Sequence, residues 1–254
     1  MKQFFLSIAT LGMFSSAASA QPGVQPMSGT FVLAEEGSGV SQPIASIAIL
    51  NFASGGTVAG VQIQRSPGST LKLNAIGTYS LNNDGTGTLA LTLTGQAVPP
   101  EGVDPFVGSA SYHLRWAKGR GVAALRMDTG LFTIGSLSPA ADAGLPKGGF
   151  IFAERGNGSP YAGLGLLNFD GANAIAGSER ITSVGLNFTN NLAGSYSMGA
   201  DGFGAFTLNI PSTDVDGNVS YSAANYVFAA GAGQILAIRT DGNSAVVSTL
   251  TSIQ

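Results

Sequence analysis

Four charged residues that recur between the two halves of the chain are the side chains best placed to do chemistry. Charged residues make up only 10% of the sequence, yet Glu35 and Arg126 reappear as Glu154 and Arg239. Apolar neighbours flank them, and burying one charge alone is costly. Two arrangements are open: each Glu meets its Arg as a structural pair across the seam of a closed barrel, or the charges point outward at strand ends. Their retention indicates structure rather than catalysis.

The remaining chemical motifs are weak. His113 is the single histidine and aligns with Tyr226, which excludes a duplicated histidine-based site and a histidine metal cluster. Without cysteine there is no thiol nucleophile, thiolate site or disulfide. The Asp214 to Asn218 segment has its glycine too early for a calcium loop. A carboxylate pair for glycoside chemistry would need one acid with a raised pKa across a cleft from a second. We therefore expect no catalytic residue, metal or cofactor.

An internal repeat positions these residues. Glu35 and Glu154 lie in similar segments 119 positions apart, in which Phe31 matches Phe150. Further matches, 117 or 113 positions apart, keep the same order: Phe52 with Phe169, Tyr79 with Tyr196, Asp84 with Asp201, and Arg126 with Arg239. Several colinear matches predict two diverged copies of one structural unit.

The ends of the two units follow from composition. Residues 1–20 combine Lys2, a short apolar run and a small-residue site ending at Ala20, which is typical of a Sec-type signal peptide cleaved before Gln21. We expect an exported protein, periplasmic or extracellular. The first unit is predicted over 21–137 and the second over 147–254, joined by a linker at 138–146 that holds two prolines.

Alternating apolar and polar residues between turn residues predict antiparallel strands in each unit, for example over 89–94 and 206–210. Turns are predicted at Asp84 and Gly85, at Asp201 and Gly202, and at Asn190 and Asn191. About eight strands per unit favour an all-β chain of two tandem meanders, each closed into a barrel to remove its edges. A two-sheet sandwich is the alternative.

The order of a Gly-x-aromatic first strand, a meander and a late Arg resembles the calycin group, the lipocalin and avidin-like barrels. The resemblance implies that Phe31 packs beneath Arg126 and Phe150 beneath Arg239. This chain has Phe where lipocalins carry Trp, and it lacks their cysteine pairs. The chain is also similar to uncharacterised exported bacterial proteins with β-repeats, which bring no known activity.

The chain carries a formal net charge of −3 and no Lys/Arg cluster, so nucleic acid is not an expected partner. No stretch after the signal is long and apolar enough to span a membrane as a helix. The leading hypothesis is a non-catalytic exported binding or surface protein that holds a small apolar ligand, a glycan or another protein. The alternatives are a structural or adhesive envelope protein, and an isomerase or lyase with a barrel pocket.

Overall fold

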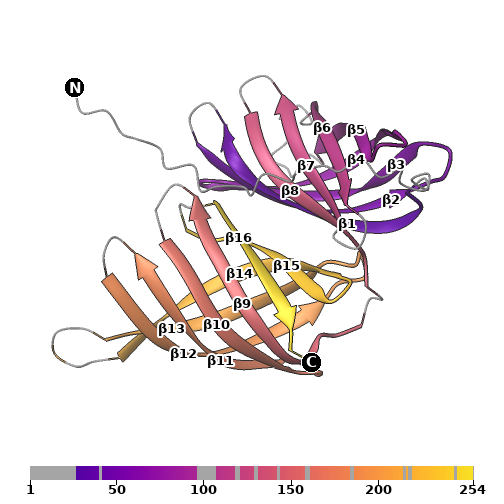
Figure 1. The fold of residues 1–254 in the computed structure, drawn as a ribbon. Helices are drawn as coiled ribbons and strands as arrows, with labels where there is room; N and C mark the ends of the chain where they lie inside the picture. The colour runs from indigo at the N-terminus through magenta and orange to yellow at the C-terminus, as the bar shows by residue number, and fades with distance from the viewer. Residues whose placement is uncertain are drawn as a thin grey trace, which may run out of the picture.

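The described part of the chain forms sixteen strands, arranged in two halves (Figure 1). The computed structural model describes residues 27–39, 42–95, 107–117, 121–128, 131–141, 144–157, 161–183, 186–213, 216, 219–242 and 245–253, none of them helical. The first half contains β1 (Gly29–Gly39), β2 (Pro43–Phe52), β3 (Thr57–Ser66), β4 (Ser69–Leu81), β5 (Thr86–Gly95), β6 (Val107–Ala117), β7 (Gly121–Asp128) and β8 (Leu131–Pro139). The second contains β9 (Lys147–Asn157), β10 (Tyr161–Asp170), β11 (Ala174–Ser183), β12 (Leu186–Met198), β13 (Gly204–Thr213), β14 (Val219–Gly231), β15 (Gln234–Arg239) and β16 (Ala245–Ser252).

Each half is a closed barrel. Every strand pairs antiparallel with the next in sequence, and the first strand of each half pairs with the last, β1 with β8 and β9 with β16. Closure gives every strand two neighbours, so no edge is left for aggregation. The all-β prediction of two eight-stranded meanders is confirmed, and the sandwich alternative is wrong because each half is one continuous sheet.

The internal repeat superposes strand for strand. Tyr79 on β4 packs on Phe52 with ring centroids 5.0 Å apart, and Tyr196 on β12 packs on Phe169 at the same distance. The Tyr79 hydroxyl donates a hydrogen bond to the Met27 carbonyl, as the Tyr196 hydroxyl does to the Pro146 carbonyl at 2.8 Å. We call this end of each barrel the aromatic end, and the opposite end the polar end.

Turn chemistry explains most strand boundaries. Gly85 and Gly202 have φ of 81° and 83°, in the left-handed region that hairpin turns require and that favours glycine. The predicted turn at Asn190 and Asn191 is wrong, because both residues lie inside β12. Asn190 faces the barrel interior, where it is buried and its side-chain amide donates a hydrogen bond to Glu179.

Glycine also allows neighbouring strands to approach closely. Gly77 on β4 and its counterpart Gly194 on β12 lie where there is no space for a side chain. A Cβ atom there would lie 1.9 Å from the Ala90 carbonyl oxygen or 2.0 Å from that of Thr207. The strands therefore approach more closely at these points than any other residue permits.

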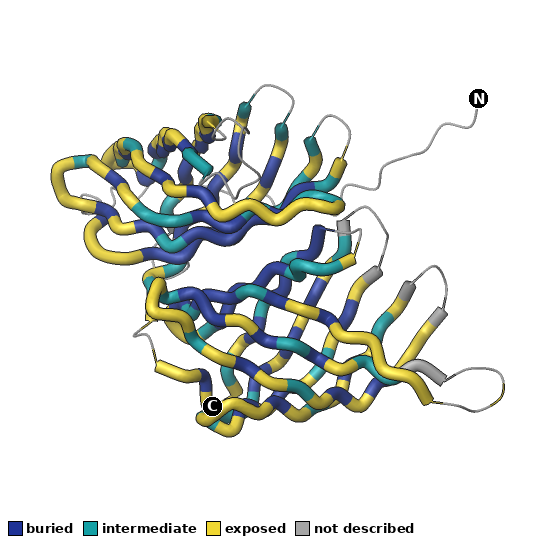
Figure 2. The backbone as a smooth tube through the Cα atoms, turned by 180° about the vertical axis from the view of Figure 1, so that it is seen from behind, coloured by how far each residue is buried: buried dark blue, intermediate teal, exposed yellow. Residues whose placement is uncertain are grey.

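Alternation along the strands separates a packed interior from a polar outer face. Inward side chains form one hydrophobic cluster per barrel. Outward positions carry many exposed serines, threonines and asparagines, such as Thr88 and Thr92 on β5. A third cluster lies where the barrels meet, and Figure 2 shows buried residues on both sides of this contact.

The segment between the barrels is bonded to the second barrel. β8 continues to Pro139, two residues into the proposed linker, and Ala140 forms a β-bridge with Gly231. The Ala141 amide donates to the Ala230 carbonyl at 2.9 Å. These bonds add to the contact between the barrels. The signal peptide proposed for residues 1–20 lies outside the described residues.

Candidate functional site

A buried polar cluster lies at the polar end of the first barrel, centred on Glu35. One carboxylate oxygen of Glu35 accepts hydrogen bonds from Ser46 at 2.7 Å, Tyr112 at 3.1 Å and Arg126 at 3.4 Å. The other accepts one from Thr133 at 2.5 Å. Glu35 is 1% exposed and the Arg126 side chain 5%. The structure thus brings these two sequence-derived residues together inside the barrel.

Arg126 is held from several sides. Its Nε donates to Asp128 at 2.5 Å and a terminal nitrogen donates to the Ser109 carbonyl at 3.1 Å. Burial alone would lower the pKa of Arg126, but the neighbouring Tyr112 and Glu35 outweigh it, and the pKa is raised. Burial first, and then the Glu35 charge, hold the pKa of Tyr112 well above its usual range. The cluster is a charge-compensated network with little exposure.

The route by which Glu35 and Arg126 meet differs from a simple seam contact. Arg126 lies on β7, the strand before the last, and the residue paired with Glu35 on β8 is Gly135. A Cβ on Gly135 would lie only 2.9 Å from the Cβ of Glu35. The missing side chain leaves the space beside Glu35 open, and Arg126 reaches the carboxylate from one strand farther away.

The packing of Phe31 beneath Arg126, implied by the calycin resemblance, is wrong. Phe31 pairs with Pro139 on β8 and packs on Phe52 at the aromatic end. Arg126 pairs with Thr133, six residues farther along β8. At about 3.3 Å per residue, the two positions are separated by about 20 Å along the strand.

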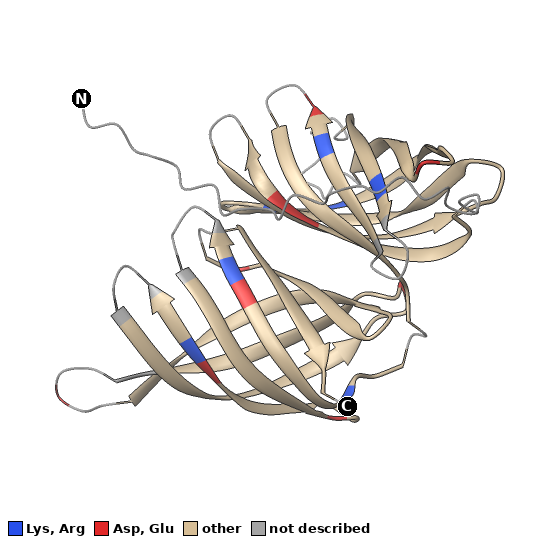
Figure 3. Ribbon diagram, in the orientation of Figure 1, with Lys and Arg blue, Asp and Glu red and all other residues tan. Residues whose placement is uncertain are grey.

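The second barrel carries a different polar cluster in the same place, with two carboxyl groups (Figure 3). Glu154 on β9 accepts hydrogen bonds from Tyr226 at 2.9 Å and from Ser248 at 3.4 Å. Glu179 on β11 accepts one from Asn190 at 3.2 Å. Both carboxyl groups are buried.

The two carboxyl groups influence one another. Burial raises the pKa of Glu154 to about 7, with the charge of Glu179 adding to the shift and the Tyr226 hydrogen bond opposing it. Burial also raises the pKa of Glu179, against the Asn190 hydrogen bond and the charge of Arg239. Arg239 is paired with Asp241 at 2.6 Å, and its side chain is 24% exposed. Arg239 lowers the pKa of both acids, while its direct pairing with Glu154 stays a prediction.

Strand register shows which residues changed between the copies. Glu179 occupies the position of Gln62 in the first barrel, and Asn190 that of Leu73, since the paired strands keep the same register. Tyr226 corresponds to Tyr112, not to His113, because these tyrosines pair with Arg239 and Arg126. His113 faces outward and is exposed. The alignment of His113 with Tyr226 was therefore wrong by one residue.

Sequence reasoning missed Glu179 and Asn190 as members of these clusters. A signal for Glu179 was present, because it alternates with Ile175 and Gly177 and so falls on the inward face of an apolar strand. A charge at such a position is costly unless it has partners or a function.

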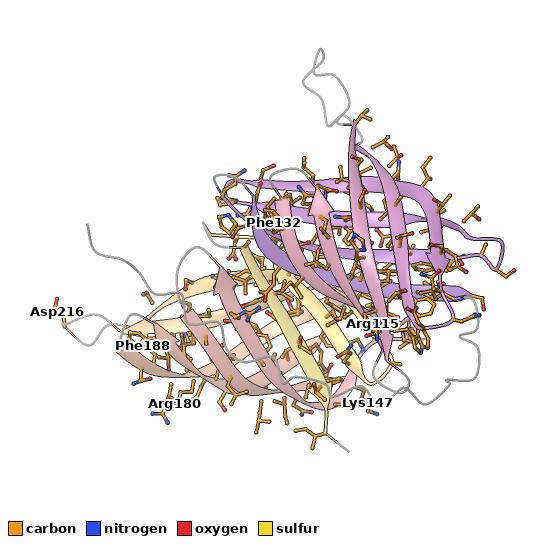
Figure 4. The ribbon with its side chains drawn as sticks, turned by 45° about the horizontal axis from the view of Figure 1, so that its top comes forward. Arg115, Phe132, Lys147, Arg180, Phe188 and Asp216 are labelled. Carbon is orange, nitrogen blue, oxygen red and sulfur yellow. The ribbon has the colours of Figure 1, made fainter. Side chains whose placement is uncertain are left out.

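Inward-facing side chains are exposed to solvent at the polar rim of the second barrel. Phe188 on β12 points inward, in register with Asn190 and Leu192, yet its side chain is 49% exposed (Figure 4). Ser222 on β14 also belongs to the inward set and is exposed. These two exposed side chains form part of the barrel's polar rim, next to the buried Glu179 and Asn190.

Two other features concern metals and membranes. In the described part of the chain, no group of three or more acidic or histidine side chains could hold a metal ion. Among the same residues, no helix is long and apolar enough to cross a membrane.

Comparisons with known proteins give no family. No family model matches the chain, and no curated protein sequence matches it, so membership of the calycin group is not shown. A solved candidate outer membrane protein from Bacteroides fragilis is similar at 7% identity and a TM-score of 0.27, covering 89% of this chain and 97% of that one. CghA is similar at 8% identity and a TM-score of 0.22, covering 94% and 96%. A porin-like protein from Bacteroides uniformis shows 10% identity and a TM-score of 0.17, covering 91% and 99%. With scores this low, the fold assignment rests on the strand pairing of this chain.

Proposed function

We propose that this chain is an exported, non-catalytic binding protein of the cell envelope that holds a small neutral glycan at the polar end of its second barrel. The observation that carries the proposal is the exposed rim at Phe188, which lies next to the buried polar groups Glu179 and Asn190. The first barrel differs there, since Gln62 and Leu73 replace Glu179 and Asn190 and Arg126 compensates Glu35.

The interior favours a polar ligand over the apolar ligand also considered. Packed side chains fill each barrel from the aromatic end up to the polar cluster. An apolar molecule would have to displace this core, and packing of this kind resists such displacement. The polar end instead presents carboxyl and carboxamide groups, those of Glu154, Glu179 and Asn190.

The chemistry of these groups suits sugar hydroxyls. Carboxylates accept hydrogen bonds, a protonated carboxyl both donates and accepts, and an asparagine amide does the same. With a pKa of about 7, Glu154 populates both forms near neutral pH. Phe188 adds an exposed aromatic face at the polar rim, of the kind that covers an apolar ligand surface.

Export is supported by the signal-like residues 1–20, with a periplasmic or extracellular destination. The described outer faces support a barrel in water, because serine, threonine and asparagine occupy many of their positions. A lipid-facing barrel has the reverse pattern, with an apolar band outside and polar groups within.

Binding can be tested by calorimetry with neutral oligosaccharides and, separately, with small amines at pH 6 and pH 8. We expect saccharide binding that weakens at least tenfold in Glu179→Gln and Asn190→Leu, which copy the first barrel. Asp84→Asn, which changes an exposed acid of the other barrel to its amide, is the matched control and should leave binding unchanged. Binding of amines only, or saccharide binding indifferent to both second-barrel changes, would disprove the glycan proposal.

Two observations favour the alternatives. The raised pKa of Glu154 beside the Tyr226 hydroxyl suits a general acid or base, as an isomerase or lyase would need. Conversion of a bound saccharide, abolished by Glu154→Gln with binding retained, would establish the enzyme. The exposed apolar side chains on the outer strands favour a structural or adhesive role instead.

A further inference from the structure

The contact between the barrels uses two different faces. Face A is the outer face of the first three strands of a barrel, and face B is the outer face of its last two strands. In this molecule, face A of the first barrel packs on face B of the second. Face A contributes Val32, Ala34, Ala45, Ile47, Ile49, Val61 and Ile63, and face B contributes Leu236, Ile238, Ala245 and Val247, with Val227 and Ala229 of the neighbouring strand β14 beside them.

No described residue covers face A of the second barrel in this way, and three of its apolar side chains are exposed. Ile151 is 45% exposed, Leu164 60% and Leu166 53%. The pairs Val32 with Ile49 and Ala34 with Ile47 in the first barrel correspond to Ile151 with Leu166 and Ala153 with Leu164 in the second. The exposed residues thus occupy the positions that the first barrel buries.

Face B of the first barrel is likewise apolar and exposed. Leu125 is 42% exposed, Ile134 66% and Phe132 66%, and Figure 4 shows Phe132 on this barrel's surface. Leu125 pairs with Ile134 as Ile238 pairs with Val247 in the second barrel. One molecule therefore buries one A–B contact and leaves one face of each kind exposed.

Both exposed faces contain a groove. Residues of face B line one of about 500 Å³, which lies where the two barrels adjoin, because Glu36 of β1 and Arg155 of β9 also line it and form an ion pair. Residues of face A, Ile151, Leu164 and Leu166, line another of about 530 Å³ together with Arg180. Exposed apolar patches with such relief typically mark protein contacts.

We propose that the protein associates head to tail, with face A of the second barrel in one copy packing on face B of the first barrel in the next. The occupant is a second copy because the buried contact already shows that an A face fits a B face of this sequence. Such contacts join unlike surfaces, so they close into a ring or extend as a chain.

Several substitutions make the contact between copies weaker than the one within the chain. On face A, Arg180 and Ser178 stand where the first barrel has Ile63 and Val61. On face B and beside it, Phe132, Ala123, His113 and Arg115 stand where the second barrel has Ala245, Leu236, Val227 and Ala229. The covalent connection also gives the internal contact a high effective concentration, which separate copies lack. Association should therefore depend on protein concentration in the micromolar range or above.

Sedimentation of the full mature chain over a range of concentrations tests the proposal. Ile134→Lys places a charge in face B, and Leu164→Lys places one in face A. We expect each to weaken association at least thirtyfold, as loss of a central apolar contact does. The matched control is Ile76→Lys on β4, which changes an isoleucine 60% exposed outside both faces and should associate as the wild type does.

Mixing separates head-to-tail association from other modes. Ile134→Lys keeps its A face and Leu164→Lys keeps its B face, so an equimolar mixture should form a 1:1 complex that grows no further. Circular dichroism melts confirm folding, and Leu125→Lys with Leu166→Lys form a second pair should either first variant misfold. A wild type that stays monomeric at millimolar concentration, variants that associate normally, or a mixture that stays monomeric would each overturn the proposal.

Discussion

Replacing Glu154 with glutamine should make the protein less sensitive to rising pH. Its carboxyl has a pKa near 4.5 in the unfolded chain and about 7 in the folded barrel, because burial disfavours its charged form. Below pH 4.5 both states hold the proton, so the group contributes no pH dependence. Between pH 4.5 and 7 the folded state binds more protons than the unfolded state, and the free energy of unfolding falls as pH rises.

The size of this loss follows from the shift. A difference of about 2.5 pKa units corresponds to about 3 kcal/mol, lost in full above pH 7. Glu154→Gln does not titrate and avoids the loss, while its side-chain oxygen can still accept the Tyr226 hydrogen bond. The stability of the variant relative to wild type should therefore rise by about 3 kcal/mol from pH 4.5 to pH 8.

Urea unfolding followed by circular dichroism at half-unit pH steps measures this difference. Asp84→Asn is the control, because hydrogen bonds from Thr86 lower the pKa of this exposed acid and its titration ends below the tested range. A variant curve parallel to that of wild type from pH 4.5 to 8 would refute the reasoning. It would mean that Glu154 is ionised throughout in the folded state, compensated by a charge such as Arg239.

Three further predictions follow from the packing. Glu35→Gln and Arg126→Met should each destabilise the protein by about 3 kcal/mol, because each leaves a buried partner without its counter-charge. In the double mutant the two changes should show a coupling energy above about 1 kcal/mol. Additive losses of a few tenths of a kcal/mol would show that the two side chains do not interact. Tyr79→Phe should cost about 1 kcal/mol by removing the hydrogen bond to the Met27 carbonyl, read as a lower urea midpoint. Gly77→Ala should cost about 1 to 3 kcal/mol, because the added methyl would overlap the Ala90 carbonyl oxygen; an unchanged midpoint would contradict the close strand approach.

Much of the fold was legible in the sequence because its signals are local. The alternation of apolar residues set the strands, and pairs such as Asp84 and Gly85 set the turns, since both depend on a few neighbouring residues. The repeat predicted two like units. The same local logic failed at Asn190, where a turn-forming residue is an interior partner of Glu179.

The candidate site was only partly predictable. Glu35 and Arg126 attracted notice because they recur, but recurrence gives no geometry. Their contact depends on Gly135, which leaves space on the strand between them. Glu179 does not recur, since the first copy has glutamine there, so comparison of the copies could not find it.

The sequence by itself determined an all-β chain of two related meanders, because strand periodicity, turn residues and the repeat are written in neighbouring positions. Only the tertiary structure decided which inward residues meet at the polar ends, and that face A of one barrel packs on face B of the other. These contacts join residues on different strands that are far apart in sequence. Glu35 and Arg126 are 91 positions apart, and Glu154 and Ser248 are 94 positions apart. Their geometry follows from barrel closure and register, which no local pattern specifies.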